Sequence, residues 1–280
     1  MKRKTQKAWA ALVMLPFVVV FFAFQIAPLL WMAIHSFYSE MTGWGWDNYR
    51  EIVSSPFYQQ AIAFSLYITF WSSVFGLLVA LIGSYSLHCL GQGKLHDWMM
   101  SFTNMTSNFS GVPLAFAFII LLGANGSITL LLRQAGLLGD FSIYSKGGLV
   151  LIYTYFQIPL GVMLLYPAFD SLREDWRESA ALLGAGTLRY WRYIALPVLM
   201  PALAGTFVIL LANALGAYAT LYALTGGNFN AIPIRISALV AGDLFLDPNM
   251  ASALGMLLVA LMVLITLVHQ RVVKRGYRKL

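Results

Sequence analysis

Charge is what this chain has least of. Only 10% of its 280 residues are Asp, Glu, Lys or Arg, and 60% are hydrophobic. A soluble domain carries roughly 25% charged residues, so the composition excludes an ordinary water-soluble protein and indicates a chain solvated mostly by lipid. Cysteine is nearly absent too, and the single Cys89 excludes a disulfide framework within the chain.

The missing charges leave six long intervals without any Asp, Glu, Lys or Arg. Each interval holds the roughly 20 apolar residues that cross about 30 Å of hydrocarbon as a helix. Helices are required because backbone groups in lipid must pair within their own segment. The sequence therefore predicts an all-α polytopic membrane protein that forms a single transmembrane domain over residues 1–280. The six predicted spans lie near residues 10–36, 60–88, 106–123, 148–168, 198–222 and 249–270.

Two features leave alternatives for particular spans. Pro113 and a long apolar loop blur the ends of the third and fifth spans. The basic stretch Lys2–Lys7 before the first apolar run resembles the start of a signal peptide. That run is too long for a signal peptide and has no small-x-small cleavage site before Gln25, so we expect a retained membrane anchor.

Basic residues gather on one side of this topology. Six spans place both termini on the same side, with an N-terminal segment at residues 1–9 and a basic tail at residues 271–280. Of the 18 Lys and Arg residues, all but four fall in these ends or in loops on their side. The four exceptions are Arg50, Arg133, Lys146 and Arg235. The positive-inside rule therefore predicts cytoplasmic termini, and the net charge of +7 reflects topology and anionic lipid rather than nucleic-acid binding.

Ionisable residues are missing from the predicted span interiors, which bears on the energy source. Ion-coupled carriers keep carboxylates or bases within the membrane to bind the driving ion. His35, His88 and His269 lie near span ends, and His96 is expected in a loop, so they form neither a catalytic constellation nor a metal site. The stretch Gly91–Lys94 lacks the spacing and the Ser/Thr of a phosphate-binding loop. We expect energy to come from a partner; the alternative, an ion-coupled carrier or channel, needs an intramembrane charge or polar stripe.

The most informative loop covers residues 170–197, between the fourth and fifth spans, and is expected to face the cytoplasm. A helix over Ser171–Leu183 would place small and apolar side chains on one face, with charged neighbours on its flanks. The residues of that face are Leu172, Trp176, Ser179, Ala180 and Leu183, and the flanking charges include Arg177 and Glu178. The pattern favours a helix that docks in a groove of a cytosolic protein. A helix lying flat on the inner leaflet is the alternative.

The second half of this loop predicts another short helix. Gly184–Gly186 interrupts the first helix with permissive backbone, and Thr187 is expected to cap the second. Apolar and aromatic side chains on that helix include Leu188, Tyr190, Trp191 and Ile194. Pro197 is tolerated in the opening turn of the next span.

The spacing within this loop resembles a known family motif. Glu178–Ala180 reads Glu-Ser-Ala, Gly184 stands six positions after the Glu, and Ile194–Pro197 reads Ile-Ala-Leu-Pro ten positions after the Gly. This is similar to the EAA loop of ABC-importer permeases, the binding-protein-dependent inner-membrane component family with the type I importer fold. Ser179 replaces the usual first Ala, a small-for-small change.

Weaker matches point to one branch of that family. Leu15-Pro16 and Ala27-Pro28 in the first span, and Leu215–Ala219 with Leu224–Gly227 at the ending of the fifth, consist mostly of small and apolar residues. They resemble the branch of permeases for polyamines, thiamine, ferric iron and aminophosphonates.

The resemblance implies a transport subunit of the bacterial inner membrane rather than an enzyme. Its implied partners are a cytosolic ABC ATPase dimer, a second permease subunit in a heterodimer, and an extracytoplasmic solute-binding protein. This chain would bind no cofactor, since ATP and Mg²⁺ belong to the ATPase subunits. The implied ATPase-coupling residues are Trp176, Arg177, Glu178, Ser179, Ala180, Leu183, Gly184, Ile194, Leu196 and Pro197.

Polar residues within or near the spans are candidates for the translocation path, because such groups are unfavourable in lipid unless they line water or meet a partner. The candidates are Asn108 and Ser110 on the third span, Gln157 on the fourth, and Asn213 and Tyr218 on the fifth. For each of them, a hydrogen bond between helices is the alternative role.

Overall fold

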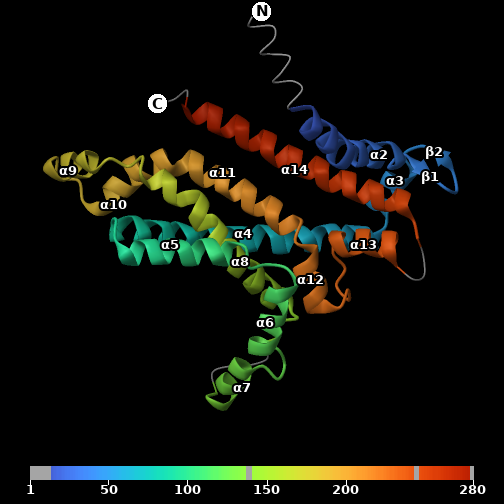
Figure 1. The fold of residues 1–280 in the computed structure, drawn as a ribbon, viewed down its shortest axis with the longest axis horizontal. Helices are drawn as coiled ribbons and strands as arrows, with labels where there is room; N and C mark the ends of the chain where they lie inside the picture. Colours follow the sequence, from blue (N-terminus) through green and yellow to red (C-terminus); the bar gives the residue numbers. More distant parts are fainter. Residues whose placement is uncertain (1–13, 137–140, 243–245, 278–280) are drawn as a thin grey trace, which may run out of the picture. The chain divides into compact units, whose positions relative to one another are not determined.

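The computed structural model describes residues 14–136, 141–242 and 246–277, and most of these residues are helical (Figure 1). Among them, six helices are long and apolar enough to cross a membrane, which confirms the predicted all-α, six-span fold. These spans are Met14–His35, Pro56–Leu90, Val112–Gln134, Lys146–Phe169, Thr187–Leu215 and Pro248–Arg271. The predicted N-terminal segment, residues 1–9, and the last three residues of the predicted tail lie outside the described residues.

The chain divides into two compact units, of which the first comprises residues up to Gln59 together with Arg235–Ala260. In the first span a π-helical turn, η1 (Phe22–Ile26), leads into α2 (Ala27–His35). The short antiparallel strands β1 (Tyr38–Ser39) and β2 (Gly43–Trp44) and the helix α3 (Asp47–Ser54) follow. The Asn48 side-chain amide donates to the carbonyls of Ser36 and Tyr38, which fixes this hairpin at the end of the span.

The last span begins in the first unit, where Asp247 and Pro248 define its start. The helix α13 (Ile232–Ala241) precedes it, and α14 (Pro248–Tyr277) forms the span. The Asp247 carboxylate accepts from the amides of Asn249 and Met250 at 3.1 and 2.8 Å. An acidic N-cap followed by Pro at the first helical position is a favourable helix start.

The second unit is a helical bundle with α8 at its centre. Its main helices are α4 (Pro56–Leu90), α5 (Lys94–Ser107), α8 (Lys146–Phe169) and α11 (Leu196–Leu215). Residues of α8 pack against both α5 and α11. The approach of α8 to α4 depends on Gly161, because a Cβ added there would lie 2.7 Å from the Ala80 Cβ. Buried Leu165, Phe169 and Leu199 belong to the apolar cluster at one end of this bundle.

The third predicted span is interrupted, so its predicted limits at residues 106–123 are wrong. The helix α5 ends at Ser107, and α6 (Val112–Leu122) begins after a break, followed by α7 (Ser127–Gln134). The break arises because Gly111 takes a positive φ of 73° and Pro113 stands at the start of α6. His96, predicted in a loop, lies instead in the first turn of α5.

The fifth span starts earlier than predicted. The helices α10 (Thr187–Tyr190), η2 (Trp191–Ala195) and α11 run on as one span, so no separate short helix precedes Pro197. In the π-helical turn η2, the Leu196 amide bonds the Trp191 carbonyl. The wider turn accommodates Pro197, whose ring would clash with a carbonyl of a regular α-helical turn. The same arrangement recurs in the first span, where η1 stands directly before Ala27 and Pro28.

Candidate functional site

The loop between the fourth and fifth spans carries a short isolated helix, α9 (Glu174–Leu182). In Figure 1, α9 and α10 lie at the end of the second unit where α4 turns into α5. The helix is shorter than the predicted Ser171–Leu183, and Glu174 and Asp175 occupy its first turn. Acidic side chains there are favoured by the positive end of the helix dipole.

Gly184 ends α9 through its backbone conformation. Its φ of 74° lies in the left-handed region. The Ala185 amide donates to the Ala180 carbonyl at 2.9 Å, and the Gly184 amide donates to the Ala181 carbonyl at 3.0 Å. These two bonds are the pattern of a Schellman C-cap, in which glycine is the favoured residue. A Cβ added to Gly184 would meet nothing within 4 Å, so only the backbone conformation requires glycine there.

The structure splits the face that was predicted to be continuous. Ala180 is only 6% exposed, so it packs within the protein's own fold and is not available to a partner. Leu182 and Leu183 are 89% and 88% exposed, and Leu188 on α10 is 83% exposed. We call Leu182, Leu183 and Leu188 the apolar tip. Sequence reasoning missed Leu182, although a pair of leucines directly before a glycine cap was a usable signal.

The charged neighbours of α9 point in different directions. Glu178 is exposed and forms no ion pair with another described residue. Arg177 instead lines a cavity of about 690 Å³ between α9 and the ends of α4 and α8. Arg173 is engaged with the Asp175 carboxylate at 2.7 Å. Arg177, Glu178 and Ser179 are all exposed, although Arg177 also lines the cavity, whereas Ala180 is buried.

The later coupling candidates form the base of the fifth span rather than a separate motif. Thr187 is the first residue of α10 and not its cap, since Gly186 occupies the cap position. Ile194 and Leu196 are half-buried, and Leu196 packs against the apolar cluster that contains Phe169. Pro197 is exposed on α11. These residues fix how the loop enters the membrane-spanning helix.

The candidate path residues lie at different depths of burial. Gln157 is fully buried; its amide nitrogen donates to Ser72 Oγ at 2.8 Å, and Ser73 Oγ donates to its carbonyl oxygen at 3.2 Å. This position matches the alternative role, a hydrogen bond between α4 and α8. Asn213 is exposed on α11, and Tyr218 is half-exposed at the start of α12 (Tyr218–Thr225).

The break between α5 and α6 and the break between α11 and α12 lie side by side. Asn108 and Ser110 are exposed in the connection between α5 and α6, and the neighbouring Gly111 amide donates to Thr220 Oγ1 at 3.0 Å. This bond brings the segment with Ser110 next to α12. Tyr153, which sequence reasoning did not single out, donates its hydroxyl to the Ala217 carbonyl at 2.9 Å, at the break that precedes α12.

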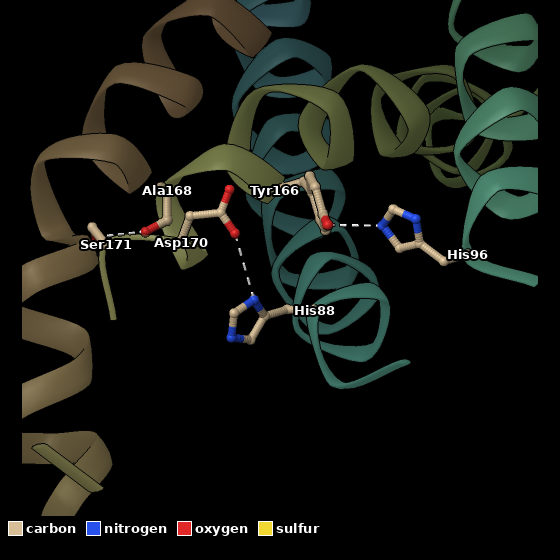
Figure 2. Close-up of polar contacts among 6 residues, drawn as sticks. All are labelled: His88, His96, Tyr166, Ala168, Asp170 and Ser171. Carbon is tan, nitrogen blue, oxygen red and sulfur yellow. Dashed lines mark hydrogen bonds and ion pairs between the residues drawn. The ribbon is translucent and has the colours of Figure 1, made fainter. Parts of the chain in front are cut away.

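Polar contacts also hold the end of α8 from which the loop departs (Figure 2). The Tyr166 hydroxyl and His96 Nε2 are 2.7 Å apart, and His88 Nδ1 lies 3.8 Å from the Asp170 carboxylate. His96 comes from α5 and His88 from α4, so both helices are joined to the end of α8. Among the described residues, no three His, Cys, Asp or Glu side chains gather as a metal site would require.

Solved structures with a similar fold are transporters. A bacterial ABC transporter involved in the import of the acidic polysaccharide alginate matches with a TM-score of 0.76 at 18% identity, over 98% of each chain. The MetNI methionine ABC transporter, in an inward-facing conformation, matches with a TM-score of 0.61 at 18% identity, over 80% of this chain and 99% of that one. At these identities the likeness concerns the fold alone.

Curated relatives carry transport permease names. The chain is 23% identical to the thiamine transport system permease protein ThiP of Escherichia coli, over 81% of this chain and 42% of ThiP. It is 26% identical to the ferric transport system permease protein FbpB of Actinobacillus pleuropneumoniae, over 91% and 37%. The chain thus spans less than half the length of these two relatives. The sn-glycerol-3-phosphate transport system permease protein UgpA of Pectobacterium atrosepticum is 21% identical, over 92% of this chain and 90% of UgpA.

A family model supplies the assignment. The model described as binding-protein-dependent transport system inner membrane component matches residues 72–279, which include α9, its glycine cap and four complete spans. The chain therefore belongs to this family of multi-pass inner-membrane proteins, the permease components of ABC importers.

Proposed function

We propose that this permease moves a small solute into the cytoplasm by alternating access, and that α9 is the helix through which an ATPase drives it. The main support for this proposal is the structure of the loop at residues 170–197. It presents a short helix, ended by Gly184 in a left-handed conformation, with a strongly exposed apolar tip beyond it. A group of exposed apolar side chains marks a surface that contacts a protein or a membrane, and we propose a protein partner for this one.

The apolar tip has the right size for docking in a groove. Full burial of one leucine side chain contributes about 1.5–3 kcal/mol, and Leu182, Leu183 and Leu188 are each more than 80% exposed. Glu178 stands one helical turn before Leu182 on the same side and would supply a charged hydrogen bond to the partner. The small side chain of Ser179 permits close approach.

Arg177 and Ala180 would transmit a movement of α9 to the helical bundle. Arg177 lines the cavity between α9 and the bundle, so we propose that it supports α9 from behind instead of contacting the ATPase. Ala180 packs within the fold and would keep α9 seated. Closure of two ATPase subunits on ATP would then shift α9 and the ends of the spans between two discrete packings.

The proposed assembly contains the partners implied by the sequence. These are a cytosolic ABC ATPase dimer that holds ATP and Mg²⁺, a second permease in a heterodimer, and an extracytoplasmic solute-binding protein. Both termini, residues 1–9 and the tail, would lie in the cytoplasm. The names of the relatives support thiamine, ferric iron or a related solute of that branch, and polyamines and aminophosphonates complete the proposed set.

The path would run beside the interrupted spans. Asn108, Ser110, Asn213 and Tyr218 carry uncharged polar groups at or near the breaks; the first three are exposed in the single chain and Tyr218 is partly buried. Facing a second permease, these groups would offer hydrogen bonds to a solute without binding it tightly. We propose that Gln157 is not part of the path, because its hydrogen bonds are taken up by Ser72 and Ser73.

Reconstitution tests this function. The chain is coexpressed with a candidate ATPase, second permease and binding protein from its source genome, and placed in proteoliposomes. We expect uptake of one radiolabelled solute (thiamine, Fe³⁺, spermidine or an aminophosphonate) only with ATP inside and binding protein outside. Uptake by the chain alone, driven by a proton or sodium gradient, would establish the ion-coupled carrier instead.

A further inference from the structure

The loop that carries α9 is tightly connected to the end of α8. Only residues 170–173 separate α8 from α9, and they form hydrogen-bonded turns. Ser171 Oγ donates to the Ala168 carbonyl at 2.6 Å, and the Leu172 amide donates to the Phe169 carbonyl at 3.0 Å. A displacement of α9 should therefore displace the end of α8 as well, because the short hydrogen-bonded connection cannot absorb it.

The end of α8 is in turn held by the α4–α5 hairpin from both sides of its turn. The Tyr166 hydroxyl shares a hydrogen bond of 2.7 Å with His96 Nε2, and the His96 side chain is 13% exposed. On the other side, His88 Nδ1 lies 3.8 Å from Asp170 Oδ1, in a more exposed ion pair. Figure 2 shows the two histidines directed at α8 from separate helices. We call these two contacts the α8 joint.

The two contacts differ in strength. The Tyr166–His96 bond is short and partly buried, and the two rings lie 5.4 Å apart, so it is a defined contact. The Asp170 side chain is 68% exposed, and exposed ion pairs contribute little because water and salt screen them. The buried ring of Phe169 lies 5.8 Å from the His88 ring. The joint therefore depends mainly on Tyr166 and His96.

The α4–α5 hairpin can respond as a unit. The helix α4 ends at Leu90 and α5 begins at Lys94, and the connection turns through Gly91 with a φ of 62°. Such a short connection forces neighbouring helix ends to move together. A contact to His96 thus moves the ends of two helices, one of which is a complete span.

We propose that the α8 joint transmits the movement of α9 to the α4–α5 hairpin, with Tyr166 and His96 as its positioning residues. The inference rests on the proposed function, because it takes α9 as the driven element. Neither residue touches solute or nucleotide. Their role is to make one rigid body of the end of α8 and the start of α5, so that ATPase closure reaches α5 and, through the hairpin, the second span.

The test follows α5 directly. The full complex in nanodiscs carries Cys89→Ser and a reporter, Leu95→Cys, in the first turn of α5, where the side chain is 60% exposed. The alkylation rate of this cysteine by a fluorescent maleimide is measured without nucleotide and after trapping with ATP, Mg²⁺ and vanadate. With the joint intact, trapping should change the rate. Tyr166→Phe keeps the ring and removes the hydroxyl, and it should shrink that change roughly two- to tenfold, the effect of one net hydrogen bond on an equilibrium.

Controls separate transmission from stability. Tyr155→Phe removes a hydroxyl from the same helix α8 at a half-exposed position and should leave the response intact. His96→Gln, which can still bond Tyr166, should keep part of the response that His96→Leu loses. ATP hydrolysis and the melting temperature of the complex are measured in parallel. A lower melting temperature with an unchanged Leu95→Cys response means that the joint is only structural, which overturns the proposal.

The remaining outcomes are also decisive. If no ATPase copurifies with the unsubstituted chain, the proposed function fails first. If the ATPase is bound and hydrolyses ATP, but Leu95→Cys responds equally in Tyr166→Phe and Tyr155→Phe, the proposed function stands and the joint is wrong. If trapping leaves the alkylation rate of Leu95→Cys unchanged even with Tyr166 and His96 in place, the joint proposal is also overturned, because the movement then does not reach α5.

Discussion

Gly184 offers the sharpest test of the loop, because its conformation and its surroundings predict different effects for different substitutions. With a φ of 74°, it sits where a residue with a Cβ is strained, yet a Cβ there would touch nothing within 4 Å. The strain of an L-residue in the left-handed region is about 1–2 kcal/mol. Gly184→Ala should therefore lower the population of correctly ended α9 by roughly 5- to 30-fold, without disturbing the membrane-spanning bundle.

Asp and Asn test the charge separately. Both adopt the left-handed conformation more readily than Ala, so Gly184→Asn should keep most activity. Gly184→Asp places a carboxylate beside Leu183, which is 88% exposed and proposed to enter an apolar groove. Burying an unpaired carboxylate is strongly unfavourable. We expect Gly184→Asp to insert into the membrane normally and to abolish uptake, and Gly184→Ala to fall between the Asp and Asn variants.

The assay combines solute uptake, copurification of the ATPase and the amount of folded chain in the membrane. Gly186→Asp is the matched control, since Gly186 also has open space around it but a φ of −67°. The reasoning is refuted if Gly184→Asp transports normally. The explanation by charge is also wrong if Gly184→Asn is as inactive as Gly184→Asp, because the negative charge of Asp would then not be the cause of the lost uptake.

Three further predictions concern the tip and the bundle. Leu182→Ser should weaken ATPase binding by roughly 10- to 150-fold, because it loses about 1.5–3 kcal/mol of apolar burial. Met41→Ser, at a 97% exposed position between β1 and β2, should leave ATPase binding unchanged. A binding titration in detergent compares the two variants. Gly161→Ala should destabilise by about 1–3 kcal/mol through overpacking against Ala80, and adding Ala80→Gly should restore the melting temperature; if it does not, the close approach is not the cause. Gln157→Leu removes the acceptor of the buried Ser73 hydroxyl, whereas the Ser72 hydroxyl keeps its bond to the Thr69 carbonyl. The substitution should destabilise by about 1–3 kcal/mol, measured by thermal unfolding, while solute affinity stays unchanged; a changed affinity would return this residue to the path.

The spans could be predicted from sequence because one physical requirement dominates them. Lipid excludes charge, so the charge-free intervals mark each crossing, and all six were confirmed. Their ends were less accurate. Pro197 suggested the start of the fifth span, but a π-helical turn before it lets the helix begin at Thr187. Gly111 stands directly before α6 with a positive φ, which composition alone does not reveal.

The loop was predicted in outline and corrected in detail. The spacing from Glu178 to Gly184 located a short helix and its end, because a C-cap in the left-handed conformation favours glycine. Helical periodicity could not tell which side of α9 faces its own bundle. Ala180 was therefore assigned to the docking face although it is buried, and Leu182 was missed although it is 89% exposed. The Tyr166–His96 contact joins residues that are distant in sequence, so no local sequence pattern predicts it.

Crosslinking from the apolar tip tests the central claim most directly. Leu183→Cys in a Cys89→Ser background is treated with a photoactivatable maleimide in membranes that contain the complete transporter. We predict a crosslink to the ATPase subunit and no labelling of Leu183→Cys by an impermeant maleimide added outside intact spheroplasts. Labelling from outside, or a crosslink to the solute-binding protein, would contradict the account.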